Sequence, residues 1–366
     1  MTPTHDWSED VLRLNVICPY YTMFPLDFPL QQLAAKPEAT SVLDPFCGRG
    51  TTLYAARLAG LPSVGVDINP VAVAIAQAKI TQVSSSAVVR LARQILESGS
   101  DGEVPEGEFW ELCYERETLR EIVTLRQALM GLETPTAAML RAVLLGILHG
   151  PRNKFLPSYL SNQMPRTYAS KPAYAVKFWK AREMDPVRIP ALDVITRRAD
   201  RLLKSTPDTQ GGHVYLGDSV EILGGVRHKF DLVVTSPPYY GMRTYVADQW
   251  LRSWFLGGVP EVPYGSSGQI ARQPNQDAFI QALADVWAAV ARRCRPGARL
   301  AIRFGAIPSA RTNPEQIVVD SLRSADAGWR VAEIHPAGTS PKRARQAEQF
   351  GKAGSAIDEI DVIAEL

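Results

Sequence analysis

The stretch Ser236-Pro237-Pro238-Tyr239 combines a small hydroxyl, two prolines and a flat aromatic ring. It follows the apolar run 231–234, which is typical of a buried parallel strand. Because proline cannot donate to a strand ladder and restricts the residue before it, we expect the strand to end at Ser236. Ligands bind at the carboxyl ends of strands in open α/β sheets. The stretch therefore predicts a turn at the active edge that can grip a planar base by its exocyclic amine.

A second group of residues, far upstream, has the strand, glycine loop and helix order of a nucleotide-type site. The apolar strand ends at Asp44, Gly48 and Gly50 permit a tight turn, and a helix starts near Thr51. The loop lacks the Lys-Ser/Thr ending of a P-loop and the third glycine of a dinucleotide fingerprint, so phosphate binding is a poor interpretation. The next strand ends in Asp67, whose carboxylate can accept hydrogen bonds from both hydroxyls of a ribose. S-adenosylmethionine therefore fits this site better than a nucleotide phosphate does.

Both stretches resemble motifs of the DNA amino-methyltransferases, which methylate adenine N6 or cytosine N4. The turn resembles their (D/N/S)PPY motif, and DPFCGRGTT at 44–52 resembles the DPFxGSGTT form of motif I, with Arg49 where serine is common. Taken singly, the turn could be a loop terminator and the glycine loop an ordinary βαβ unit, but their occurrence together favours the methyltransferase. The resemblance implies an α/β fold with the Rossmann-like, seven-stranded sheet of class I methyltransferases and S-adenosyl-L-methionine as cofactor.

The resemblance also implies further cofactor contacts. Asp218 follows a short strand at 213–217, where a carboxylate in the family receives the adenine amino group; an N-cap of the next helix is the alternative. The aromatic segment 20–25 resembles motif X, which folds over the methionine end, and a core-covering loop is its alternative. The residues predicted to bind the cofactor are Phe24, Asp44, Phe46, Gly48, Gly50, Thr51, Asp67, Ile68, Asp218 and Ser219.

The mechanism implied by the resemblance begins with a base flipped out of the duplex. Tyr239 would stack on the extruded ring, while the Ser236 hydroxyl and the Pro237 carbonyl would accept the two amine hydrogens. The turn contains no Pro-Cys nucleophile, which argues against cytosine C5 methylation. Because serine at the first motif position is commoner in cytosine-N4 enzymes, we predict a cytosine-N4 DNA methyltransferase of restriction-modification type, with a cognate restriction endonuclease as a partner.

Three alternatives to that function stay open. Adenine-N6 methylation uses the same apparatus, and the first motif residue distinguishes the two only as a preference. Some tRNA methyltransferases share similar motifs, but they usually carry an N-terminal RNA-binding module, for which we expect no space before the first strand. A DNA-binding scaffold with a dead site is the non-enzymatic alternative.

Positive charge is concentrated in one segment of the chain. The net charge is +2, yet the segment from Gly150 to Thr206 contains twelve Lys or Arg against four Asp or Glu. Interleaved aromatic residues such as Tyr168 and Trp179 make this composition typical of a nucleic-acid surface; a solvated helix face with buried aromatics is the alternative. Arg243 lies in an extension of the SPPY turn that is similar to one in cytosine-N4 enzymes, and an ion pair within the fold is its alternative role. Lys342 and Arg343 belong to a basic cluster near the C-terminus, for which a solvated surface cluster is the alternative. The residues predicted to contact DNA are Arg166, Lys171, Lys177, Lys180, Arg243, Lys342 and Arg343.

The spacing of the apolar runs predicts seven strands, the last two being the antiparallel pair that closes a methyltransferase sheet. Segment 85–208 lies between the second and third strands and has helical patterning. We therefore divide the chain into an N-terminal half of the methyltransferase core at 1–84, a mostly helical, basic insertion at 85–208 for target recognition, and a C-terminal half of the core at 209–366.

The rest of the composition bounds the compartment and excludes other chemistries. The chain has no run of about 18 apolar residues and a polar N-terminus, so we expect neither a membrane span nor a signal peptide. Its four cysteines are scattered without CxxC spacing, which indicates a reducing cytoplasm and argues against a zinc or disulfide framework. The five histidines show no metal-ligand pairing, so we predict no metal.

Overall fold

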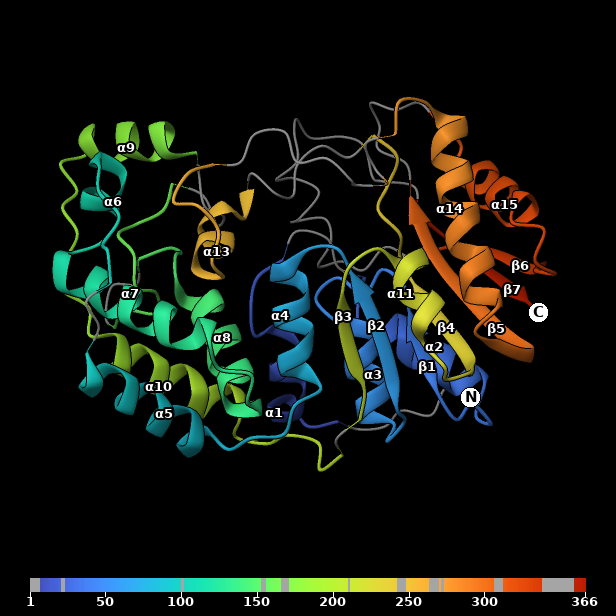
Figure 1. The fold of residues 1–366 in the computed structure, drawn as a ribbon, viewed down its shortest axis with the longest axis horizontal. Helices are drawn as coiled ribbons and strands as arrows, with labels where there is room; N and C mark the ends of the chain where they lie inside the picture. Colours follow the sequence, from blue (N-terminus) through green and yellow to red (C-terminus); the bar gives the residue numbers. More distant parts are fainter. Residues whose placement is uncertain are drawn as a thin grey trace.

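A computed structural model of the chain shows a sheet-based part and a helical part side by side (Figure 1). The residues that it describes are 7–20, 24–99, 102–152, 156–165, 171–209, 211–241, 248–262, 270, 273–305, 312–337 and 359–366.

The sheet has seven strands in the order β3-β2-β1-β4-β5-β7-β6. The strands are β1 (Val42–Asp44), β2 (Ser63–Asp67), β3 (His213–Leu216), β4 (Phe230–Thr235), β5 (Cys294–Gly305), β6 (Arg330–Pro336) and β7 (Glu359–Glu365). The strands β1 to β5 run parallel, whereas β7 is antiparallel to both of its neighbours, β5 and β6. This order confirms the predicted seven strands, the closing antiparallel pair and the Rossmann-like fold class.

Helices cover both faces of the sheet, because successive residues of a strand point to opposite sides. Val42 and Val234 pack against the helices of one face, and Leu43 and Val233 pack against those of the other. The first face carries α2 (Asp27–Ala35) and α3 (Thr51–Leu58), and the second carries α11 (Ser219–Gly225), α14 (Gln276–Ala291) and α15 (Pro314–Ser324).

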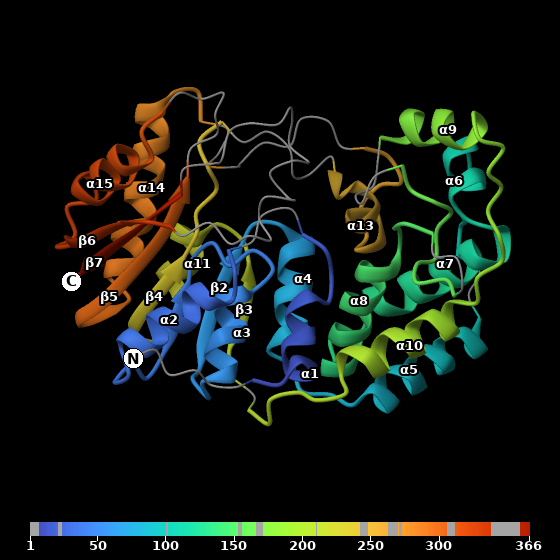
Figure 2. The same ribbon diagram turned by 180° about the vertical axis from the view of Figure 1, so that it is seen from behind.

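The helix α4 (Pro70–Lys79) stands between the sheet and the helical part (Figures 1 and 2). It begins where Asn69 caps it, with the Asn69 side chain accepting from the Val71 amide at 2.9 Å and proline at the first helical position. The helical part holds α5 (Ser85–Ser98), α6 (Glu108–Cys113), α7 (Arg116–Met130), α8 (Pro135–Ile147), α9 (Pro172–Lys180) and α10 (Ala191–Leu202). The helical patterning of the segment between β2 and β3 is thus confirmed.

Packing adds three short helices from elsewhere in the chain to this helical part. The short helices α1 (Glu9–Leu12) and η1 (Arg13–Val16) precede the sheet, and α13 (Trp250–Phe255) follows the SPPY turn. The ring centroids of Trp254 and Trp110 lie 4.6 Å apart, and those of Trp250 and Phe109 lie 4.9 Å apart. The core of the helical part therefore extends beyond the insertion itself. Among the described helices, none has the length and apolar character needed to cross a membrane.

Candidate active site at the carboxyl edge of the sheet

The glycine loop and the SPPY turn are neighbours, because β1 and β4 pair directly in the sheet. The Thr235 hydroxyl, at the end of β4, donates to Asp44 Oδ1 at 2.7 Å. The Thr52 hydroxyl, in the first turn of α3, donates to the Val234 carbonyl at 3.0 Å. The structure thus brings together the two motifs that lie far apart in the sequence and holds them with two buried hydrogen bonds.

The glycine loop is open at one of its glycines and tightly packed at the other. Gly48 (φ +49°) and Gly50 (φ +74°) both have a backbone conformation that favours glycine. A Cβ at Gly48 would meet no atom within 4 Å, whereas a Cβ at Gly50 would lie 2.8 Å from Ala76 Cβ. Gly48 therefore faces open space, and Gly50 allows α4 to approach the loop closely.

Asp67 closes the loop from the end of β2. One of its carboxylate oxygens accepts from the Gly48 amide at 2.9 Å and the other accepts from the Asn69 amide at 2.8 Å. Burial raises the pKa of Asp67 to about 6, although the two amide donors oppose the shift. Each oxygen keeps a second lone pair, so the carboxylate can still accept from a ribose. The neighbouring Ile68 side chain is 47% exposed, which leaves an apolar surface beside this acceptor.

Asp218 and Ser219 meet the loop from the next strand end. Asp218 caps α11 by accepting from the Val220 amide at 2.8 Å, so the N-cap interpretation of this residue is realised in the fold. Its side chain remains partly exposed. The Ser219 hydroxyl donates to the Pro45 carbonyl at 2.5 Å. Ser219 therefore supports the loop from below, which the sequence alone did not indicate.

In the SPPY turn, Ser236 is half-buried, and its hydroxyl has no hydrogen-bond partner within the described part of the chain. Tyr239 is only 7% exposed: its ring packs edge to face on Phe304 at 5.3 Å, and its hydroxyl lies 2.8 Å from Glu359 Oε1. The expected stacking surface of Tyr239 is thus occupied by the core in this arrangement. The physical reason is that the ring completes the apolar layer beneath α14.

Three other predicted cofactor residues are also packed into the protein. Phe24 lies against Phe28, with ring centroids 5.5 Å apart, in the layer between the sheet and α2. Thr51 is buried at the start of α3, and Phe46 is partly exposed, with its ring 6.0 Å from that of Trp287. For Phe24, the core-covering alternative describes the observed packing.

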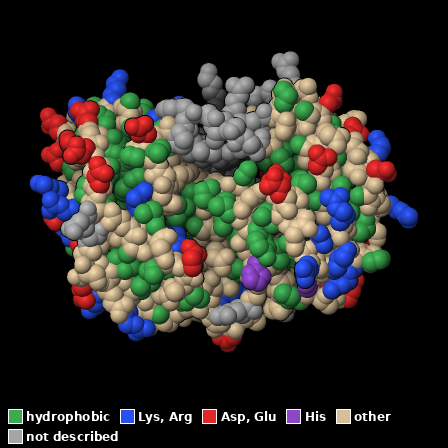
Figure 3. Space-filling view, viewed as in Figure 1, with side chains coloured by type: hydrophobic (Ala, Val, Ile, Leu, Met, Phe, Trp, Pro, Cys, Tyr) green, Lys and Arg blue, Asp and Glu red, His purple; other side chains and the backbone are tan. Residues whose placement is uncertain are grey.

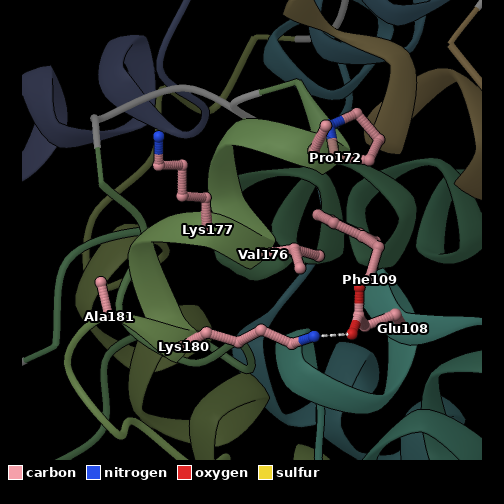
Figure 4. Close-up of a pocket in the computed structure, with 8 residues that line it drawn as sticks. Glu108, Phe109, Pro172, Val176, Lys177, Lys180 and Ala181 are labelled. Atoms are coloured by element: carbon pink, nitrogen blue, oxygen red, sulfur yellow. Dashed lines mark ion pairs between the residues drawn. The ribbon is translucent and has the colours of Figure 1, made fainter.

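The predicted DNA contacts are described only in part. Arg166, Arg243, Lys342 and Arg343 lie outside the described residues. Lys177 and Lys180 are exposed on α9 and line a pocket of about 760 Å³ between α6 and α9 (Figure 4). Lys171 is also exposed, at the position just before α9. Lys180 points to Glu108 and forms an ion pair with it, while Lys177 points away from that carboxylate.

Three of the other cations in the basic segment have partners within the fold. Arg188 pairs with Glu121 at 2.5 Å, Lys204 pairs with Asp10 at 2.8 Å, and Arg198 donates to the Ile17 carbonyl. On the face seen in Figure 3, acidic and basic side chains are intermixed over the described surface of the helical part. The composition of the segment therefore overstates the charge that it offers to a partner.

The site's residues fit S-adenosylmethionine. Asp44 is fully buried, and its Oδ2 has no hydrogen-bond partner among the described residues, so an acceptor is available for a cationic ligand. The other parts of the cofactor also find suitable surroundings. The open space above Gly48 can take the amino acid, the apolar side chain of Ile68 can contact the adenine, and the carboxylate of Asp67 can accept from the ribose. Within the described residues, no group of three or more His, Cys, Asp or Glu is placed to hold a metal ion.

Comparison with known proteins gives a family match over a short part of the chain. Residues 30–78, which run from α2 into α4, match the family model described as DNA methylase (N6_N4_Mtase). None of the curated proteins matches the chain.

Several solved structures are similar at low identity. One is the rRNA methyltransferase AviRa from Streptomyces viridochromogenes (13% identity, 97% of this chain and 92% of that chain covered, TM-score 0.36). Another is TrmN from Thermus thermophilus (10% identity, 92% and 49% covered, TM-score 0.32). A third is an S-adenosylmethionine-dependent methyltransferase from Clostridium acetobutylicum ATCC 824 (6% identity, 93% and 90% covered, TM-score 0.34).

The strand order and the glycine loop define a methyltransferase of class I architecture, with S-adenosylmethionine as its cofactor. The match at 30–78 supports a DNA amino-methyltransferase family for this chain.

Affinity for S-adenosylmethionine is expected to rise with pH up to about 7. Burial raises the pKa of Asp44 to about 7, against the hydrogen bond from Thr235, which lowers it. Protonated Asp44 is neutral, so the attraction to a cationic cofactor grows as the carboxyl ionises and levels off above pH 7. Calorimetric titrations between pH 5.5 and 8.5 measure this dependence.

The variant Asp44→Asn should lose the part of this dependence centred near pH 7 and keep a weaker rise near pH 6, where Asp67 titrates. A profile that is identical in the wild type and in Asp44→Asn would show that Asp44 does not face the cofactor.

Proposed function

We propose that this chain transfers a methyl group from S-adenosylmethionine to the exocyclic N4 amine of cytosine in DNA, as a site-specific methyltransferase of restriction-modification type. The observation that carries the proposal is the hydrogen bond from Thr235 to Asp44, which holds the SPPY turn beside the glycine loop. The family match to DNA methylases supports the nucleic-acid substrate.

The chain's own contribution to the reaction is positioning and electrostatics. The Ser236 hydroxyl and the Pro237 carbonyl accept the two hydrogens of the target amine, which draws the nitrogen lone pair out of conjugation with the ring. The bound cofactor supplies an electrophilic methyl group. Because the methylated nitrogen is strongly acidic, no dedicated general base is required, and no histidine is assigned to the site.

The role of Tyr239 within this proposal differs from simple stacking. Its ring packs on Phe304 and its hydroxyl donates to Glu359 Oε1, and together these contacts fix the direction in which the turn leaves β4. The base would then lie against the half-buried prolyl face of Pro238, unless the Tyr239 ring swings out when DNA binds. Either arrangement leaves the amine next to Ser236.

DNA would approach along the side of the molecule on which the parallel strands end. In Figure 1, α9 of the helical part faces the same side. Lys171 and Lys177 are exposed there, and phosphate contacts of this kind position a duplex without reading its sequence. The insertion at 85–208 is proposed as the target-recognition region on its place in the chain and on these lysines.

The function is tested by incubating the purified protein with S-adenosylmethionine and unmethylated plasmid DNA, then identifying the methylated nucleoside by mass spectrometry. We expect N4-methyldeoxycytidine, at a small set of sequence positions. N6-methyldeoxyadenosine would replace cytosine by adenine as the target base. Labelled methyl groups transferred to RNA but not to DNA would move the substrate to RNA, and no transfer to either would favour a binding scaffold.

A further inference from the structure

Arg49 stands inside the glycine loop, between Gly48 and Gly50, where serine is common in similar motifs. Its side chain is only 4% exposed, and its Nε is buried without a hydrogen-bond partner. Within the described part of the chain, the whole guanidinium makes no hydrogen bond and no ion pair. Because a guanidinium carries five N–H donors, burying it without an acceptor is costly.

The other buried cations nearby are all supplied with acceptors. Arg57 donates to the backbone carbonyls of Lys79, Thr81, Pro207 and Thr209. Arg252 donates to the Leu145 carbonyl, and Lys79 Nζ donates to Asn15 Oδ1 at 2.9 Å. Arg49 thus differs from these three residues in that its guanidinium makes no hydrogen bond to any described residue.

Among the described residues, no ionised acid acts on Arg49. Burial lowers the pKa of Arg49 to about 10, and the Arg49 charge helps to lower the pKa of Lys79. Cys18, the other ionisable group that acts on Arg49, is fully buried, and burial raises its pKa, so it stays a neutral thiol. The geometry leaves a cationic group at the cofactor loop that lacks an anionic partner.

The position of Arg49 in the fold indicates which anion could pair with its guanidinium. On one side is the glycine loop, open above Gly48. On the other side is Cys18, just ahead of the segment predicted to fold over the methionine end of the cofactor. The Tyr20 hydroxyl accepts from the Asn69 side chain at 3.1 Å, which ties Tyr20 to the junction of β2 and α4.

We propose that Arg49 binds the carboxylate of the methionine moiety of S-adenosylmethionine. That carboxylate is the cofactor's one anionic group, and the planar guanidinium can hold it through two parallel hydrogen bonds. The proposal rests on the use of S-adenosylmethionine and is independent of which base or nucleic acid is methylated. It makes Arg49 a cofactor-selecting residue at a position where serine is common.

The test compares S-adenosylmethionine with decarboxylated S-adenosylmethionine, which lacks only the carboxylate, by calorimetric titration without nucleic acid. For the wild type we expect the carboxylate to strengthen binding by about tenfold to a hundredfold. In Arg49→Met that difference should disappear, because affinity for the intact cofactor falls while affinity for the decarboxylated one is unchanged. Arg49→Lys, which keeps the charge but loses the fork, should retain part of the difference.

Arg198→Met is the matched control, since Arg198 also lies near Cys18 but donates to the Ile17 carbonyl. It should change the affinities for both ligands equally or not at all. The midpoint of thermal unfolding without ligand should not fall in Arg49→Met, because the change removes an unpaired buried charge. The proposal would be overturned if Arg49→Met and Arg49→Lys bound both ligands more weakly by the same factor. It would also be overturned if the variants still preferred S-adenosylmethionine over its decarboxylated form but bound an oligonucleotide more weakly, because the anion would then be a phosphate.

Discussion

Replacing Ser236 with alanine is expected to lower kcat for methyl transfer by about 100-fold to 1000-fold, which is the range for loss of one pre-positioned hydrogen-bonding group. The hydroxyl lies at the end of β4, one residue beyond the Thr235 side chain that bonds Asp44. Its removal leaves the amine with a single acceptor, the Pro237 carbonyl, so the lone pair stays conjugated with the ring. Single-turnover rates on saturating DNA measure the effect on chemistry directly.

Two comparisons separate this effect from damage to the fold. Affinity for S-adenosylmethionine should be unchanged in Ser236→Ala, since the cofactor contacts lie in the glycine loop and at Asp67. Ser98→Ala removes a hydroxyl that donates to the Gln94 carbonyl on α5, and it should leave the rate as in the wild type. A rate in Ser236→Ala within a few-fold of the wild type would show that the turn does not hold the amine.

The architecture was accessible from the sequence because local signals agree with the fold. Apolar runs that end in Asp44, Asp67 and Thr235 mark strands whose carboxyl ends must meet at one edge of a parallel sheet, and the structure places them there. Glycine and asparagine at helix starts, such as Gly50 and Asn69, mark the elements that follow. Consistency between these levels is what allowed seven strands to be predicted.

The surroundings of individual side chains were not accessible in this way. Whether Tyr239 faces a ligand or the core depends on Phe304 and Glu359, which lie 65 and 120 positions away in the chain. The basic segment looks like a nucleic-acid surface in composition, yet Arg188 and Lys204 find acidic partners on other helices. Tertiary contacts of this kind leave no periodic trace in the sequence.

The helical part shows the same limit on a larger scale. A boundary drawn along the chain encloses α5 to α10, but α13 packs its two tryptophans against α6 from beyond the SPPY turn. The segment that follows the proposed catalytic turn therefore ends anchored in the proposed recognition region. The chain therefore connects the proposed recognition region directly to the turn, a link that a separately folded insertion would lack.

Alanine at the two loop glycines should affect different properties: mainly folding stability at Gly50 and mainly cofactor affinity at Gly48. In Gly50→Ala the new Cβ lies 2.8 Å from Ala76 Cβ and 2.9 Å from its Cα, at a φ of +74°. The contact is with backbone of α4, which cannot move as a flexible side chain does. Together with the left-handed conformation, we expect a loss of about 2–5 kcal/mol in the free energy of unfolding, measured by denaturant titration.

Gly48→Ala has a similar backbone conformation, at a φ of +49°, but its Cβ meets nothing within 4 Å. The expected loss of stability is therefore only about 1–2 kcal/mol, from the conformation alone. Affinity for S-adenosylmethionine should fall by about tenfold or more, because the methyl group enters the space proposed for the cofactor, at a cost of about 1–3 kcal/mol for an overpacked contact. The two variants add the same methyl group two positions apart in one loop. If cofactor affinity fell in both variants only in proportion to their loss of stability, Gly48 would not border the cofactor. A Gly48→Ala variant that folds but no longer binds S-adenosylmethionine would place the cofactor at the open side of the loop.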